Sequence, residues 1–285
     1  MKNKATTPTI CQRDDWVDLK GPFTLEDVRQ LKRFGDINKL AVFDQPLLTT
    51  AVARGFSELK SVRWFWLWCD VKRAAMRYII SIPGLQELDV QHIKAPGKLT
   101  GFTETSLATF RCNWSLDEHD LIEIASCKSL KNLGAQSSQL TLRAFKALLK
   151  LSHLQSLDIE ATKFNDTMAA LVSASPTIES LDIGATRITR KGLKHLCRMK
   201  QLRSLDLWAC DITETDIDLL ADLPNLEYLS IGEVGEKKTF NAATLIPRLY
   251  AIPSLKRIWL DGVRVSAEQK GELEKRYQYA RVDCD

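Results

Sequence analysis

The strongest constraint on the fold of this chain is an internal repeat with the pattern L-x-x-L-x-L. Clear copies of the pattern begin at Leu85, Leu130, Leu154, Ile178, Leu202, Leu226 and Leu255. Weaker copies begin at Ile37, Leu59 and Leu107. The copies that run from Leu130 to Leu226 follow one another at a constant spacing of 24 residues. A fixed period of this length is typical of a protein that stacks one small structural unit many times.

Each copy of the pattern predicts a short β-strand followed by a helical segment. Side chains alternate along a strand, so positions 4 and 6 point to one side of the sheet and position 5 points to the other. Position 5 is mostly polar, as at Asp89, Asp182 and Ser230, and is expected to face solvent. Helices are predicted to begin at the N-cap residues Thr141, Asp166, Thr189 and Thr213. One unit alone cannot bury its apolar side, whereas stacked units share a continuous core.

With these features the chain resembles the leucine-rich repeat family, whose units run about 20 to 29 residues. The resemblance covers roughly residues 37–265 and is strongest from Leu130 to Ile231. It implies an α/β solenoid with a curved parallel β-sheet on the concave face, helices on the convex face, and about ten repeats between two caps. It also implies a recognition protein without catalytic activity, and the compact chain resembles bacterial intracellular members of the family.

The repeats are expected to lie between two caps in a single elongated domain. Residues 1–36 do not follow the pattern and predict an N-terminal helical cap, in which Thr24 begins an amphipathic helix that ends at Gly35. Residues 37–265 form the repeats. Residues 266–285 predict a C-terminal cap with a charged helix over 267–279 and a closing segment at 281–283. Five extra residues in the unit from Leu226, around 232–238, are expected to form a polar loop.

Composition argues against several classes of function. Lys and Arg number 40 against 36 Asp and Glu, so the net charge of +4 is too small to favour a nucleic-acid partner. None of the seven cysteines stands in a CxxC motif, and neither a zinc site nor any other metal or cofactor is expected. The apolar run at residues 64–69 is too short to span a membrane, and the N-terminus lacks the apolar segment of a secretory signal. We therefore expect a cytoplasmic monomer.

The N-terminal repeats place aromatic and charged side chains on the predicted concave face. Position 8 reads Trp66, His92 and Trp114 on consecutive strands, and position 5 reads Arg63, Asp89 and Arg111. Trp and Arg are frequent hot spots of protein interfaces, so these six residues and Phe65 are predicted to contact a partner. The alternative is that the tryptophans pack on an irregular end and the charged residues form a surface ion triplet. Trp64, at position 6, is interpreted as core.

Two further sets of candidate binding residues lie on the C-terminal repeats. An acidic column is formed by Asp158, Asp182 and Asp206 at position 5, with Glu160 beside it. Such a column suits a basic partner, although aspartates at this position also occur as solvated surface residues. The second set is aromatic and consists of Trp208, Tyr228 and Trp259. Large aromatic side chains on a rigid sheet favour an interaction surface, because burial is their usual preference.

The function predicted from these features is that of a scaffold that binds a partner protein on its concave face. It is expected to act as an inhibitor or as an immunity protein that neutralises a toxin or enzyme. A substrate-recognition adaptor or an effector of a larger complex is the alternative. A hydrolase would use Asp158 and Asp182 at the separation of a retaining glycosidase pair. Carboxylates in identical rows are, however, expected to share one pKa, which opposes a division into acid and base.

A nucleic-acid role is a more distant alternative. Trp66, Trp114 and Arg111 offer rings and a guanidinium on which bases can stack. The acidic column would repel the phosphates of a bound nucleic acid, so a protein partner is preferred.

Overall fold

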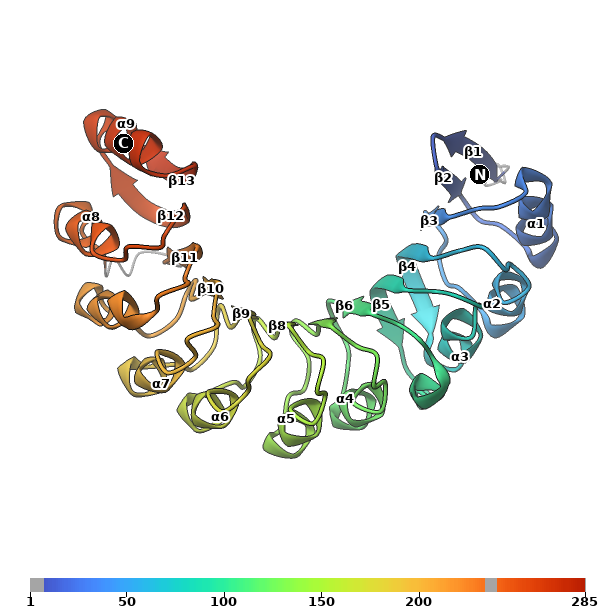
Figure 1. The fold of residues 1–285 in the computed structure, drawn as a ribbon. Helices are drawn as coiled ribbons and strands as arrows, with labels where there is room; N and C mark the ends of the chain where they lie inside the picture. The colour runs from blue at the N-terminus through green and yellow to red at the C-terminus, as the bar shows by residue number, and fades with distance from the viewer. Residues whose placement is uncertain (1–7, 234–239, 285) are drawn as a thin grey trace, which may run out of the picture. The chain divides into compact units, whose positions relative to one another are not determined.

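The fold consists of strand–helix units that follow one another along the chain. The computed structural model describes residues 8–233 and 240–284. The chain divides into two compact parts. Unit 1 comprises residues 1–139 and 150–153, and unit 2 comprises residues 140–149 and 154–285. In each unit the strands lie in sequence order on one side and the helices lie on the other, as Figure 1 shows. The side that the strands expose is called the strand face below.

Unit 1 begins with a β-hairpin and continues with parallel strands. Its strands are β1 (Thr9–Arg13), β2 (Trp16–Lys20), β3 (Lys39–Phe43), β4 (Trp64–Lys72), β5 (Glu87–Lys94), β6 (Thr109–Cys112) and β7 (Asn132–Gly134). Its α-helices are α1 (Leu25–Arg29), α2 (Thr50–Phe56), α3 (Met76–Ile80) and α4 (Glu118–Ile124). Its 3₁₀ helices are η1 (Gln30–Phe34), η2 (Arg73–Ala75) and η3 (Phe102–Glu104).

Unit 2 repeats the strand–helix alternation with greater regularity. Its strands are β8 (Ser156–Asp158), β9 (Ser180–Asp182), β10 (Ser204–Asp206), β11 (Tyr228–Gly232), β12 (Arg257–Val265) and β13 (Tyr279–Cys284). Its helices are α5 (Leu142–Leu148), α6 (Asp166–Val172), α7 (Arg190–Leu196), the 3₁₀ helix η4 (Glu214–Asp222), α8 (Ala242–Tyr250) and α9 (Ala267–Arg276). The predicted α/β solenoid with parallel strands is confirmed. None of the helices in the described ranges is both long enough and apolar enough to span a membrane.

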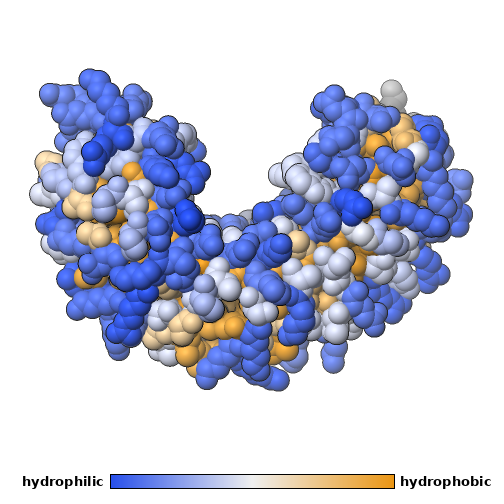
Figure 2. All heavy atoms as spheres, in the orientation of Figure 1, coloured by the Kyte–Doolittle hydropathy of each residue, from blue (hydrophilic) through white to orange (hydrophobic). Residues whose placement is uncertain are grey.

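The core lies between the strands and the helices of each unit. Positions 4 and 6 of the repeat supply it: Leu157, Ile159, Leu181 and Ile183 are each at most 1% exposed. Burying a side chain of this size contributes about 1.5 to 3 kcal/mol. Most of the surface visible in Figure 2 is hydrophilic in both units. The two sides of most strands therefore separate core from solvent as the repeat pattern predicts, but Ser230 at position 5 is only 2% exposed, so its expected exposure was wrong.

A tight turn follows each of the short strands. Position 8 adopts a left-handed conformation in four successive repeats, with φ of 54° at Ala161 and 52° at Ala185. At position 9, the Thr162 hydroxyl donates a hydrogen bond to the Ile159 carbonyl at 2.7 Å, and Thr186 makes the equivalent bond at 2.6 Å. The threonine hydroxyl thus supplies a donor to a backbone carbonyl in the turn.

The helix caps are largely those that the sequence predicts. Thr141, Thr189 and Thr213 are N-caps, whereas α6 is capped by Asn165 and the prediction of Asp166 was wrong. The Asp166 carboxylate instead accepts hydrogen bonds from the next helix: from the Thr189 N–H at 2.9 Å, the Thr189 hydroxyl at 2.7 Å and the Gly192 N–H at 3.0 Å. A Cβ at position 192 would lie 2.4 Å from Asp166 Oδ1, so this contact requires glycine.

The N-terminal segment contains more than the predicted helix. Thr24 forms a capping box at the start of α1, and the helical segment ends at Gly35, as predicted. Before it, β1 and β2 form an antiparallel hairpin that the sequence analysis did not predict. β2 then pairs with β3 in parallel, which extends the sheet by two strands beyond the repeats. The predicted polar loop around 232–238 lies mostly outside the described residues.

Unit 1 also holds a buried ion cluster. The Arg73 side chain is 7% exposed and its Nη1 lies 2.8 Å from Asp117 and 3.1 Å from Asp120. Its Nη2 donates a hydrogen bond to the Ser115 carbonyl at 3.0 Å. Asp120 is itself only 2% exposed. Arg73 therefore supplies the charge that allows a carboxylate to lie in the core.

Candidate functional site

The register of β4 differs from the one predicted. Phe65 pairs with Leu40 on β3 and with Leu88 on β5, so this repeat begins at Val62 and not at Leu59. Phe65 is 0% exposed and belongs to the core, so its prediction as a partner-binding residue was wrong. Trp66, and not Arg63, takes position 5 of this repeat. Arg63 is exposed and precedes the strand.

Three tryptophans line the strand face of β4. Trp64, Trp66 and Trp68 alternate with buried residues along this strand, so all three lie on its solvent side. Trp64 and Trp66 are half-buried and Trp68 is 55% exposed. The interpretation of Trp64 as core was wrong, because the corrected register moves it to the other side. We call these three residues the tryptophan stripe.

Neighbouring strands widen the tryptophan stripe with further rings and with lysines. The rings of Trp16 on β2 and Trp66 lie 4.5 Å apart, and Lys39 Nζ lies 4.5 Å from the centre of the Trp64 ring. The same Lys39 Nζ lies 2.8 Å from Oδ2 of Asp15, with which it forms an ion pair. At the other end of the stripe, Phe43 stacks on Trp68 with 6.4 Å between ring centres. These contacts hold the rings in fixed positions. A partner that binds to the rings therefore does not incur the entropy cost of ordering their side chains.

The predicted row of Trp66, His92 and Trp114 is not formed. Because β4 and β5 shift register after Leu67, His92 lies opposite Asp70, and its Nδ1 is 3.0 Å from Asp70 Oδ1. Trp114 follows the end of β6 and is 63% exposed.

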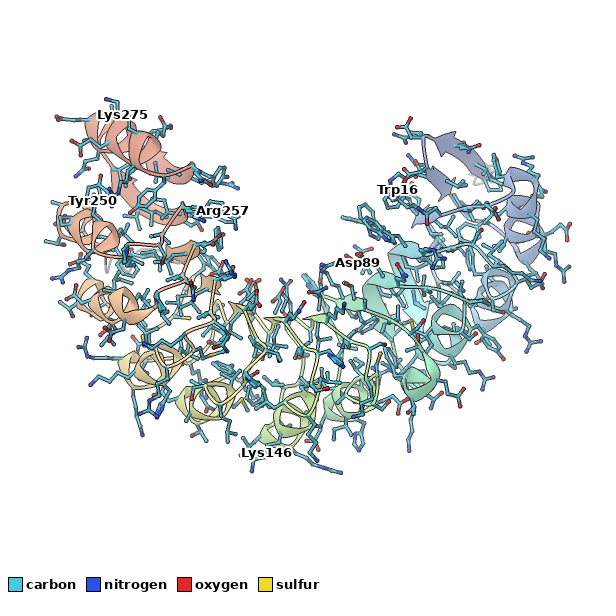
Figure 3. The ribbon with its side chains drawn as sticks, viewed as in Figure 1. Trp16, Asp89, Lys146, Tyr250, Arg257 and Lys275 are labelled. Atoms are coloured by element: carbon cyan, nitrogen blue, oxygen red, sulfur yellow. The ribbon has the colours of Figure 1, made fainter. Side chains whose placement is uncertain are left out.

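The charged row at position 5 of unit 1 differs from the predicted one in a single member. In the structure it reads Trp66, Asp89 and Arg111. Burial raises the pKa of Asp89, although the charge of Arg111 opposes this shift. Figure 3 shows Trp16 and Asp89 on the strand face of unit 1.

The acidic column of unit 2 forms as predicted. Asp158 pairs with Asp182, and Asp182 pairs with Asp206, on three adjacent parallel strands. The carboxylates of Asp158, Glu160 and Asp182 approach one another within 4.8 Å. Each aspartate also accepts the backbone N–H two residues on, at 3.2 Å for Asp158, 3.0 Å for Asp182 and 2.8 Å for Asp206. Oxygens this close together can share one cation, either a metal ion or an organic cation.

Burial and neighbouring negative charges raise the pKa values of carboxyls in the column. Burial, together with the charges of Asp206 and Asp158, raises the pKa of Asp182 to about 8. Burial also raises the pKa of Asp206 and, with the charges of Asp158 and Asp206, that of Glu160. These carboxyls therefore hold a proton more readily than carboxyls in solvent do. Of the lysines and arginines in the described residues, none pairs with Glu160, Asp182 or Asp206.

The C-terminal aromatic residues lie beside the acidic column. Trp208 follows β10, and its indole Nε1 donates a hydrogen bond to Asp261 Oδ2 at 2.7 Å. A Cβ at position 232 would lie 2.6 Å from Trp208 Cδ1, so the absence of a side chain at Gly232 lets the indole approach this strand closely. Tyr228 and Trp259 stand on the strand face, each beneath an arginine: Arg257 lies 5.5 Å from the Tyr228 ring, and Arg281 lies 4.4 Å from the Trp259 ring.

In unit 2 the helices and the strand face carry different side chains. In Figure 3, Arg257 stands on the strand face of unit 2, whereas Lys146 and Tyr250 lie among the helices. Trp16, Phe43 and Trp68 of the aromatic surface were not among the predicted site residues, and Trp64 had been assigned to the core. The alternation of exposed and buried side chains along β4 could have identified Trp68 from the sequence. Trp16 lies on β2, and its place on the strand face follows only from the hairpin of β1 and β2, which was not predicted.

Comparisons with known proteins agree with this architecture. A family model described as "FBD-associated F-box protein At5g56370, LRR repeats" matches residues 97–246, which is more than half of the chain. No curated protein matches the sequence. Among solved structures, an internalin (inlF) from Listeria monocytogenes is similar with a TM-score of 0.55 and 15% identity, over 95% of this chain and 81% of that one.

A second solved structure is similar at the level of the fold. It is that of a TLR13–ssRNA13 complex, with a TM-score of 0.54 and 17% identity over 93% of this chain. The match covers only 39% of the TLR13 chain, so the present chain spans about two fifths of its length. Together with the matched family model and the strand–helix units of 24 residues, these likenesses show that the chain belongs to the leucine-rich repeat family.

Proposed function

We propose that this chain is a non-catalytic scaffold that binds a partner protein through its strand face. The observation that carries the proposal is the tryptophan stripe on β4, with Trp68 55% exposed. Soluble proteins rarely leave several large aromatic side chains together on a rigid surface unless that surface meets another molecule. Tryptophan is also among the residues that contribute most to protein interfaces.

The neighbours of the stripe favour a protein over a nucleic acid as the partner. Lys39, which would be the closest cation for a phosphate, is paired with Asp15 at 2.8 Å and stacked on Trp64. Asp89 adds a carboxylate on the adjacent strand. A stacking platform for nucleic acid needs a positively charged groove along it, and these contacts neutralise the nearest positive charge.

Affinity capture with the full chain, followed by measurement on the purified partner, tests the proposal. The partner is identified from a lysate of the source cells, and its dissociation constant is then measured for wild type and two variants. Trp68→Ala is expected to weaken binding by at least about 10-fold, because a hot-spot tryptophan contributes about 2 kcal/mol. Leu142→Ala is the control, since this side chain is 40% exposed but lies on helix α5.

Equal loss of affinity in both variants, or no loss in Trp68→Ala, would refute a role for the tryptophan stripe. Measuring the activity of the identified partner with and without the chain then distinguishes an inhibitor or immunity protein from an adaptor. An inhibitor suppresses that activity at stoichiometric concentration, whereas an adaptor leaves it intact.

A further inference from the structure

The strand face of unit 2 combines unpaired carboxylates with aromatic rings. Glu160, Asp182, Asp206, Trp208 and Tyr228 lie on the adjacent strands β8 to β11 or directly after them. We call these five residues the acidic–aromatic face. It belongs wholly to unit 2 and is separate from the tryptophan stripe of unit 1.

The arrangement leaves the carboxylates accessible to a ligand from the solvent side. Position 7 of three successive repeats reads Glu160, Gly184 and Trp208. Gly184 places no side chain between its neighbours, and a Cβ there would lie 3.4 Å from Asp182 Oδ1, from Glu160 Cγ and from the Trp208 carbonyl oxygen. Gly184 is itself buried, so a group that reaches this place from the solvent side meets the half-buried carboxylates of Asp182 and Glu160, with the backbone carbonyl of Trp208 beside them.

Within the described residues, no lysine or arginine pairs with the carboxylates of this face, although Arg257 lies over the Tyr228 ring. Elsewhere in the described residues, buried carboxylates have an arginine partner: Asp120 lies 3.1 Å from Arg73, and Asp216 lies 2.5 Å from Arg190. Asp182 and Asp206 have none and face each other on adjacent strands instead. The repulsion raises the pKa of Asp182, so this carboxyl tends to hold a proton, and a cation brought from outside would take the place of that proton.

The rings beside the carboxylates narrow the chemistry of the cation. An aromatic face next to a carboxylate suits a guanidinium or an ammonium on an alkyl stem, because the ring stacks on the cation or its stem while the oxygens accept its N–H groups. A metal ion would use the oxygens alone and would gain nothing from Trp208 or Tyr228. The combination therefore points to a side chain and not to a metal.

We infer that the acidic–aromatic face binds an arginine- or lysine-bearing segment of the partner protein. The cationic head is held by Asp182 with Glu160 or Asp206, and its stem lies against Trp208 or Tyr228. This inference rests on the proposed scaffold function and specifies the chemistry of the partner at a second surface.

Calorimetric titration of the full-length protein with a capped hexa-arginine peptide at low ionic strength tests the inference. Wild type is expected to bind this peptide and not its hexa-citrulline analogue, which keeps the shape but lacks the charge. The double variant Asp182→Asn and Asp206→Asn is expected to bind at least about 10-fold more weakly, since amides keep the size of the side chains. Glu272→Gln, an exposed carboxylate on α9, is the control and is expected to leave binding unchanged.

Three results would overturn the inference. The first is that wild type does not bind the peptide, and the second is that the double variant binds it as wild type does. The third is that CaCl₂ alone binds with dependence on Asp182 while the peptide does not, which would identify a metal site. The Trp68→Ala experiment separates this outcome from the scaffold proposal. If capture of a partner still depends on Trp68, the scaffold function stands even where the peptide test fails.

Discussion

The substitution Asp182→Asn is expected to remove a specific pH dependence from the stability of the chain. In the folded chain, burial and the charges of Asp206 and Asp158 raise the pKa of Asp182 to about 8, against 3.8 for an ordinary aspartate. Between these two values the folded chain holds a proton on Asp182 that the unfolded chain releases. The free energy of unfolding therefore falls as pH rises through this window and levels off once the folded-state carboxyl also ionises.

The size of the effect follows from one proton. A group that is protonated only in the folded state changes the free energy of unfolding by about 1.4 kcal/mol per pH unit. From pH 5 to pH 7 this amounts to about 3 kcal/mol for wild type. The amide that replaces the carboxyl in Asp182→Asn cannot ionise, so the variant is expected to lose correspondingly less stability over that range and to be the more stable protein at pH 7.

Urea denaturation followed by circular dichroism at pH 5, 6 and 7 measures this difference. Glu272→Gln is the matched control, because its exposed carboxylate lies on α9, away from the acidic column. It is expected to keep the wild-type slope. Parallel slopes for wild type and Asp182→Asn would show that Asp182 is ionised in the folded chain, and the account of the acidic column would fail.

Four further substitutions test the packing and backbone conformations described above, each by urea denaturation. Arg73→Met is expected to cost about 3 to 5 kcal/mol, because it leaves the buried carboxylate of Asp120 without its cation; a loss below about 1 kcal/mol would contradict this. Ala161→Gly is expected to stabilise the chain by up to about 1 kcal/mol, since φ is 54° there, whereas Ala169→Gly inside α6 should destabilise it by a similar amount. Gly232→Ala is expected to cost about 1 to 3 kcal/mol, because its Cβ would lie 2.5 Å from a backbone oxygen of the next strand; unchanged stability would refute that contact.

The regular repeats could be predicted from the sequence almost residue by residue. The copies at Leu154, Ile178 and Leu202 fix which side chains face the core, and the structure pairs Asp158, Asp182 and Asp206 in the predicted register. Only one assignment of these copies puts leucine or isoleucine at every core position. Hydrophobic alternation therefore determines the register wherever the two sides of a strand differ clearly.

The same reasoning failed at β4 for a physical reason. In the run of residues 64–69 both sides of the strand are apolar, so alternation does not distinguish core from solvent. Pairing of Phe65 with Leu40 and Leu88 decides the register, and this information lies in the neighbouring strands. A shift by an odd number of residues exchanges the two sides, which moved Trp64 outward and Phe65 inward. The N-terminal hairpin was missed because β1 is almost entirely exposed and carries no hydrophobic pattern.

The carboxylate of Asp166 has a consequence for how the chain opens. It accepts the Thr189 and Gly192 amide hydrogens, which belong to the start of the following helix and would otherwise exchange freely with water. Fraying of α7 at this end breaks bonds anchored in α6, so the two repeats are expected to open as one cooperative segment. Deuterium uptake at these two amides would then report the opening of both repeats together. A chain that lacks either repeat would also lose the hydrogen bonds by which Asp166 joins the two.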